Sequence, residues 1–342
     1  SSEALEQHRI LLHSNIGDIN SWQAVGRIFA RQQRRDAVWC ACGVLKLHTT
    51  LDENAEKFYN DHQHSSLALK KPLGGTAAWE TYLYKPSHDV LLGRLFEWLA
   101  RVTANHIANR TLQDLGLSPR DRVSLREKSR FTNYLGTVSK ILDVPIPGVY
   151  RSASVRGIIK EPTHPPAMII GPEVLTGRKG KELRFQLGKA MSYFALPHLL
   201  AGMYPAGHLR TMVAAALRIV RPDIAQNAGS GVRGVQKKLE EVMRADDRAA
   251  LSDLANEVIA RGVNPDVTQW LRDVECAANR AGHLLSNDLD VSMHLLRVEN
   301  QHGSRWSDLS LQEALNDLQR YQISEQYFAL RQEVGAAIPE TS

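Results

Sequence analysis

Residues 183–193 read Leu183-Arg-Phe-Gln-Leu-Gly-Lys189-Ala-Met-Ser-Tyr193, and a second informative stretch, Glu275-Cys-Ala-Ala-Asn-Arg280, lies further along the chain. Apolar side chains lead into the five residues 189–193, and their spacing predicts a helix over residues 181–195. The second stretch lies in a predicted helix over residues 266–286. We therefore expect two amphipathic helices, each carrying charged residues within an apolar frame.

The two stretches resemble the active site of gluzincin metallopeptidases of the CAAX prenyl protease type. In that family one helix carries H-E-x-x-H after an apolar lead-in, and a later helix carries E-x-x-A-D-R, whose Glu is the third zinc ligand. Here Glu275, Ala278 and Arg280 match the later motif. Asn279 stands in place of its Asp, and residues 189–193 occupy the five positions of H-E-x-x-H. The resemblance implies a metallopeptidase-like fold that has lost its metal ligands.

This loss bears directly on catalysis. Zinc hydrolysis needs two imidazoles one helical turn apart, a carboxylate from elsewhere and an open position for water. Lys189 presents an ammonium group without a lone pair for a metal, and Ala190 cannot take the proton from a bound water. We therefore expect no catalytic residue, no metal ligand and no cofactor. Glu275 is then expected to pair with Lys189 or Arg280, and a Lys189–Glu275 pair would replace the charge of the metal.

A second resemblance covers most of the chain. Residues 90–335 resemble a domain found at the C-terminal end of long tetratricopeptide-containing proteins of myxobacteria and related bacteria. The shared segments are the His88-Asp89 helix start and residues 117–123, 170–177, 183–200, 276–289 and 323–331. No biochemical activity comes with this resemblance, so it bears on fold and context.

Composition limits the class of protein. The 342 residues are 43% hydrophobic and 23% charged, which suits one large core or two smaller ones. No apolar run reaches about 18 residues and no signal peptide opens the chain, so we expect a cytoplasmic protein without a membrane span. The start at Ser1 rather than Met suits a portion of something longer. Three cysteines, Cys40, Cys42 and Cys276, argue against a disulfide framework and are expected to be buried.

The net charge of +5 and the pI near 9.1 are compatible with an acidic partner but do not require one. No aromatic residues interleave with the basic clusters and no nucleic-acid motif accompanies them, so solvated faces and no nucleic-acid partner are expected. These clusters are Arg31, Arg34 and Arg35; Arg178, Lys179 and Lys181; and Arg233, Lys237 and Lys238.

Residues 1–70 are expected to form tetratricopeptide-like helical hairpins. Trp22 stands early in the first helix of one such unit, Ser21 is its expected N-cap, and the second helix starts near Asp36. A single unit cannot bury its apolar face alone. We expect the unit either to cap an array lying upstream or to pack against the domain that follows.

Turn-forming residues mark 71–89 as a linker, followed by a metallopeptidase-like domain over residues 90–338. Helices are expected at 90–111, after the Ser118-Pro119 turn and at 129–142. Short β-prone runs then predict a small antiparallel sheet at about 148–171, placed before a short helix at 172–175. Further helices are expected at 209–219, 233–245, 248–262, 288–298, 310–319 and 323–335.

Other motifs favour structural interpretations. The sequence of residues 229–234 matches G-x-G-x-x-G, but no strand precedes it, so we expect a flexible interhelical loop rather than a nucleotide site. Ser192 lacks the G-x-S-x-G context of a hydrolase nucleophile. His62 and His64 are too few to hold a metal, and scattered histidines are expected to be structural: His198, His208, His283 and His294.

The sequence thus predicts a mainly α protein, a helical bundle with a small antiparallel sheet, preceded by a tetratricopeptide-like hairpin. The leading functional hypothesis is a non-catalytic scaffold module that holds a protein partner in the former active-site cleft, beside the sheet. The residues expected to line that cleft are Lys189, Tyr193, Glu275 and Asn279. The alternatives are a metal-dependent hydrolase with a relocated site around Glu275, and a basic anion-binding or nucleic-acid-binding protein.

Overall fold

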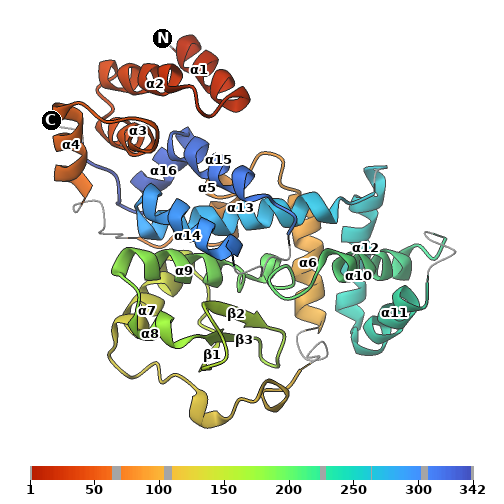
Figure 1. Cartoon of the computed structure of the whole chain (residues 1–342). Coiled ribbons are helices and arrows are strands. Elements are labelled where there is room, and N and C mark those ends of the chain that lie inside the picture. The colour runs from red at the N-terminus through yellow and green to blue at the C-terminus, as the bar shows by residue number, and fades with distance from the viewer. Residues whose placement is uncertain are drawn as a thin grey trace.

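A central helix, α13 (Val267–Ser286), runs across the middle of the molecule, and most of the other elements lie around it (Figure 1). The computed structural model describes residues 2–63, 71–103, 110–223, 229–262, 264–301 and 307–339. Helix α13 is buried on nearly every side, because α6, α9, α10, α14 and α15 all pack against it. It is therefore the structural axis of the fold.

Helix α9 (Gly180–Ser192) crosses α13 at a pair of glycines. A Cβ atom on Gly188 would lie 2.5 Å from a methyl carbon of Leu285, and one on Gly282 would lie 2.8 Å from the backbone oxygen of Phe185. Only glycine permits this approach, so the two helices meet backbone to backbone. Both expected helices are confirmed, and the crossing brings residues 189–193 close to the middle of α13.

The sheet lies beneath α9 and has three strands, β1 (Gly148–Arg151), β2 (Ile158–Glu161) and β3 (Ala167–Ile170). Their order is β1-β3-β2. The expectation of an antiparallel sheet is wrong in part, because β3 pairs antiparallel with β2 but parallel with β1. The third strand along the chain lies between the first two. This order leaves β2 at an edge.

The N-terminal hairpins consist of α1 (Ser2–Ser14), α2 (Ile19–Arg31), α3 (Arg35–His48) and α4 (Glu53–Gln63). The expected N-cap Ser21 is wrong, because Asp18 caps α2 and the buried Ser21 hydroxyl donates to its carboxylate. Helix α3 packs against α14 (Leu289–Gln301) and α15 (Leu311–Gln322), and Asp36 forms an ion pair with Arg331 of α16 (Glu325–Glu333). The hairpins therefore pack against the domain that follows them.

The range expected to be a linker, 71–89, contains a short helix, α5 (Thr76–Tyr82), with Trp79 buried. Helix α6 (Val90–Thr103) follows Asp89, whose carboxylate accepts from the backbone N–H of Leu92. The helix expected over residues 90–111 is described as far as Thr103. Residues 104–109 lie outside the described part of the chain, and Thr111 is not helical. After Ser118 the chain forms only a 3₁₀ turn over Pro119–Asp121, so the helix expected there is wrong.

The remaining helices are α7 (Arg130–Leu142), α8 (Pro172–Thr176), α10 (Ala206–Val220), α11 (Ser230–Val242) and α12 (Ala245–Ala260). The glycine-rich motif at 229–234 forms the first turn of α11 and follows helix α10, so the flexible-loop interpretation is wrong. In the part of the chain that the structure describes, none of the helices has the length and apolar character needed to cross a membrane.

One hydrophobic core extends from Leu5 in α1 to Ile338 near the C-terminal end of the described chain. Cys40, Cys42 and Cys276 are all buried in it as free thiols, as expected. Burial raises the pKa of Cys42 to about 11 and that of Cys276 to about 12, so both thiols stay protonated at neutral pH. The fold class is thus mainly helical with a small mixed sheet.

Candidate functional site: a cavity beside an edge strand

A cavity of about 890 Å³ lies between β2, the C-terminal end of α9, and helices α13 and α14. Three of the four residues expected in the former cleft line it: Lys189, Tyr193 and Glu275. The other lining residues come mainly from the β2 region, α9 and the segment after it, and they are Arg110, 156–162, Glu173, Arg178, Gln186, Ala190, Ala201, Met203, Tyr204, Leu271, Val298, Glu299 and Ser307. The sequence therefore located the cavity wall formed by α9 and α13.

Asn279, the fourth expected residue, is not among the residues that line the cavity. Its side chain is buried, and neither its amide nitrogen nor its amide oxygen has a hydrogen-bond partner among the described residues. The expectation that Asn279 lines the cavity is therefore wrong, because its side chain packs inside the protein. An unpaired buried amide carries a desolvation cost without a compensating bond.

Lys189 forms an ion cluster in the cavity wall. Its ammonium nitrogen Nζ lies 3.6 Å from Oε1 of Glu275 and 2.6 Å from Oε2 of Glu299 on α14. The hydroxyl of Ser307 donates a hydrogen bond to Oε2 of Glu275. The expected Lys189–Glu275 pair is confirmed, and one ammonium group is shared by carboxylates from two helices. Within the described ranges, no group of three or more His, Cys, Asp or Glu residues is placed to hold a metal ion.

A second lysine enters the same cavity from β2. The ammonium of Lys160 lies 4.1 Å from the ring centroid of Tyr193, the C-cap residue of α9. Burial, and next the positive charge of Lys189, lower the pKa of Lys160 to about 8, although Glu299 and Glu275 act in the opposite direction. A substantial fraction of Lys160 is thus cationic at neutral pH, in contact with an aromatic face.

The free edge of β2 borders the cavity. Residues 156–162 line it without interruption, whereas a cavity against one face of a strand would be lined by every second residue. The backbone N–H of Gly171 donates to the oxygen of Gly157, which fixes the alternation of the antiparallel ladder. Ile159 and Glu161 therefore bond to β3, while the backbone groups of Ile158 and Lys160 point away from it. In the described part of the chain, β3 is the only strand paired with β2.

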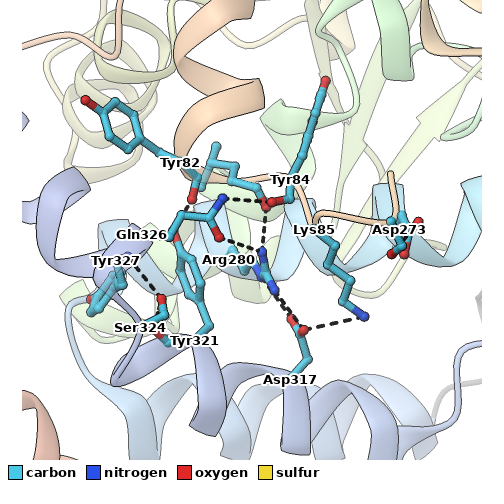
Figure 2. A network of polar contacts seen from close by, with 12 residues as sticks. Tyr82, Tyr84, Lys85, Asp273, Arg280, Asp317, Tyr321, Ser324, Gln326 and Tyr327 are labelled. Atoms are coloured by element: carbon cyan, nitrogen blue, oxygen red, sulfur yellow. Dashed lines mark hydrogen bonds and ion pairs between the residues drawn. The ribbon is translucent and has the colours of Figure 1, made fainter. Parts of the chain in front are cut away.

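The motif residue Arg280 lies on another face of α13. Its guanidinium donates two hydrogen bonds to Asp317 of α15, at 3.0 and 2.9 Å, and a third to the backbone oxygen of Leu83 (Figure 2). Lys85 approaches the same carboxylate at 3.4 Å, and Gln326 accepts from Arg280 at 3.3 Å. Arg280 therefore serves as a buried cross-link, and the alternative of a Glu275–Arg280 pair is wrong.

The charges of this network shift the acidity of its carboxylate. Burial alone would raise the pKa of Asp317, but the guanidinium of Arg280 and the ammonium of Lys85 hold it below its ordinary value. Asp317 is therefore ionised at neutral pH, and its two cationic partners come from α13 and the segment after α5.

The buried histidines have structural roles. His198 faces the hydroxyl of Tyr84 at 2.9 Å, and His283 lies between Ser292 and Gln322. Burial lowers the pKa of His198 to about 3 and that of His283 to about 4, so both are neutral. His64 lies outside the described residues.

The solvated faces expected for the basic clusters hold for Arg31, Lys179, Lys237 and Lys238, which are exposed, whereas three other members contact neighbouring elements. Arg34 bonds to Glu325, Arg35 lies 3.0 Å from the ring of His62, and Lys181 pairs with Asp288. These contacts tie separate elements together, so the side chains are committed to the fold.

Sequence reasoning missed Glu299, Lys160 and Ser307. Glu299 and Ser307 lie in or after α14, outside either motif. The packing of α14 against α9 and α13 brings Glu299 to Lys189, and Ser307 bonds to Glu275. Lys160 did carry a signal, because it follows the apolar pair Ile158-Ile159 in a strand that was expected beside the cleft. A charged residue within a short strand often marks an edge.

Comparisons of the chain with models of known protein families, with curated proteins and with solved structures find no match.

Proposed function

We propose that this protein is a non-catalytic interaction module whose cavity binds an extended peptide segment of a partner protein. The segment adds as a strand to the free edge of β2, in the mode known as β-augmentation. The observation that carries the proposal is the meeting of an unpaired strand edge with a cavity of about 890 Å³. That volume lies in the upper part of the range of small-ligand pockets and suits a few residues of peptide.

The outward backbone groups of Ile158 and Lys160 supply the hydrogen bonds for this mode. Two donors and two acceptors face the cavity, because the other half of the ladder is used by β3. Side chains of the bound segment would alternate between the cavity interior and the mouth, where Tyr193, Tyr204 and Met203 offer apolar surface. Backbone bonds would provide affinity, and these walls would provide selectivity.

The ion cluster supports a binding role over catalysis. Lys189 stands at the position that corresponds to the first histidine of H-E-x-x-H, and it meets Glu275, which corresponds to the third ligand. The contact of α9 with α13 supports the resemblance to a metallopeptidase whose metal has been replaced by an ammonium group. Ser307 already donates to Glu275, and Lys189 is held by two carboxylates, so neither side chain is free to act on a substrate.

The test is peptide binding with a blocked strand edge. A displayed library of extended peptides is selected on the purified chain, and the affinity of selected peptides is measured by fluorescence anisotropy. Ile158→Pro removes an outward N–H without removing a bond to β3, so it should abolish binding while leaving the thermal midpoint within a few degrees. Unchanged affinity in this variant would contradict strand addition.

Ile159→Pro is the matched control. Its N–H is expected to donate to β3, so this substitution should lower stability through a lost ladder bond. The pair of variants separates a damaged edge from a damaged sheet, since the two residues are adjacent and carry the same side chain.

A metal-dependent hydrolase is the second candidate, and one observation favours it: Glu275 and Glu299 converge in an open cavity. Metal analysis of the purified chain distinguishes the two proposals. One tightly held equivalent of zinc or manganese that disappears in Glu275→Gln would favour the hydrolase over the interaction module.

A further inference from the structure

The formal charges of the cavity walls nearly cancel, but these charged groups are not all paired with one another. The walls carry five basic residues, Arg110, Arg156, Lys160, Arg178 and Lys189, and four acidic residues, Glu161, Glu173, Glu275 and Glu299. The difference in formal charge, five minus four, is small. The decisive feature is how these charges are paired.

Each of the four acids already has a partner in the wall. Glu275 and Glu299 share Lys189, and Glu161 lies 3.7 Å from Arg110. The carboxylate of Glu173 accepts from the backbone N–H of Gly157 at 2.5 Å. Every acid therefore has a protein partner, although Glu275 and Glu299 share one ammonium group and the backbone N–H that bonds to Glu173 carries no charge.

The basic residues are not all paired. Arg178 lies 3.8 Å from Glu182, whereas Arg156 and Lys160 have no carboxylate of the described residues within ion-pair distance. Arg156 is exposed, so Lys160 is the unpaired cation that is partly shielded from water. Its ammonium rests on the ring of Tyr193, which orients the side chain without cancelling its charge. A cation that is shielded from water and not neutralised is costly, and an incoming anion lowers that cost.

We infer that Lys160 forms a carboxylate subsite, so that the cavity selects peptide segments carrying an acidic group beside β2. This inference rests on the proposed function and names the ligand class of the same site. The carboxylate would belong either to an Asp or Glu side chain or to the C-terminus of the segment. Both sources present the same two oxygens to an ammonium donor.

The position of Lys160 on the strand makes the subsite compatible with strand addition. Its backbone groups point outward along the edge, so a paired residue of the ligand would lie directly opposite. Opposed side chains on neighbouring strands have Cβ atoms about 4.5–5.5 Å apart, which is within reach of a lysine and a glutamate. The pKa of Lys160 is lowered, as expected for a buried ammonium group without a carboxylate at ion-pair distance.

The experiment compares four probes on the full chain by fluorescence anisotropy at pH 7. They are N-acetylated extended peptides of one sequence with a central Glu or Gln, each with a free or an amidated C-terminus. We expect the preferred carboxylate to tighten binding about tenfold or more over its neutral counterpart. A Glu preference in the amidated pair assigns the subsite to a side chain, and a preference for the free C-terminus in the Gln pair assigns it to the terminus.

Lys160→Met should erase that preference, since it keeps the apolar stem and removes the charge, and Lys160→Arg should restore most of it. Lys237→Met is the control for general electrostatics, because this lysine of α11 does not line the cavity and its side chain is 80% exposed. It should leave the preference unchanged.

Equal affinity for all four probes in the unaltered chain would overturn the carboxylate subsite and leave strand addition standing. Failure of every probe and of every library peptide to bind would overturn the proposed function itself. A preference that survives in a folded Lys160→Met would also overturn the inference, because the charge would then come from another residue.

Discussion

Two faces of α13 carry buried ion pairs, and they differ in what surrounds them. On one face Arg280 and Asp317 are closed in by α15, α16 and the segment after α5, and Arg280 donates to Asp317, to the backbone oxygen of Leu83 and to Gln326 (Figure 2). On the other face the Lys189–Glu275–Glu299 cluster borders an open cavity. The motif that contains Glu275 and Arg280 thus divides into a residue facing the cavity and a residue fixing the fold.

This difference shows that two residues matching the same family motif can have separate roles in this chain. Arg280 donates hydrogen bonds to Asp317, Leu83 and Gln326, so it should stabilise the fold whatever the cavity binds. Glu275 is held by Lys189 and Ser307, and the volume beside it is open to a ligand. Substitutions on the two faces should therefore separate stability from binding.

The largest effect is expected for Arg280→Met. Removing the guanidinium leaves Asp317 buried, with Lys85 as its one ion-pair partner among the described residues, and breaking a buried pair typically costs about 3–5 kcal/mol. Urea unfolding of the purified chain measures the loss. Arg272→Met is the control on the same helix, because its pairs with Glu313 and Asp308 are more exposed and should be worth less than about 1 kcal/mol. Equal losses in the two variants would contradict the contrast.

A smaller loss is expected for Lys189→Met. The two carboxylates lose their shared cation, but water can reach them through the cavity, so the cost should be about 1–3 kcal/mol. Urea unfolding under the same conditions gives the comparison. Adding Glu275→Gln should recover part of the loss, since one buried charge is removed with its partner. A loss as large as that of Arg280→Met would mean that the cavity face is as closed as the other one.

The pH dependence of binding provides a third test. Lys160 is cationic below its pKa of about 8 and neutral above it, and its charged neighbours are Lys189, Glu275 and Glu299. A peptide carboxylate stays ionised across this range, so the affinity for an acidic peptide should fall as pH rises from 7 to about 9.5. Anisotropy titrations of the Glu and Gln probes measure it, and the Gln probe should show little change. A parallel decline for both probes would point to a group other than Lys160.

The smallest effect is expected at Asn279, whose side chain neither joins the Arg280–Asp317 network nor lines the cavity. Asn279→Leu replaces a buried amide without partners by an apolar side chain of similar size, which should raise the free energy of unfolding by about 1 kcal/mol. Thermal and urea unfolding check it. A clear loss of stability would show that the amide makes bonds that matter to the fold.

The helices were predictable from sequence because apolar spacing reports burial directly. The patterns over 181–195 and 266–286 place α9 and α13, and the resemblance of their motifs to a metallopeptidase site made Lys189 one of the two expected partners of Glu275. The closeness of the two helices depends on Gly188 and Gly282, which read in sequence as ordinary glycines inside helices. Their role appears only when the two backbones are seen together.

The sheet order and half of the cavity were not predictable in this way. Short strands specify their pairing partners weakly, so nothing in residues 148–171 indicated that β3 would lie between β1 and β2. That order is what leaves β2 at the edge and points Lys160 toward Tyr193. Glu299 bonds to Lys189 from a helix more than a hundred residues further along the chain, and no local sequence pattern predicts that contact.

Amide hydrogen exchange at the edge of β2 tests the central claim most directly. The amides of Ile158 and Lys160 point into the cavity and should exchange quickly in the free protein, whereas those of Ile159 and Glu161 should already be slow. A saturating acidic peptide selected for binding should slow the exchange of Ile158 and Lys160 by about tenfold or more. Exchange at these two amides that stays unchanged in the saturated complex would contradict strand addition and the account of the cavity that depends on it.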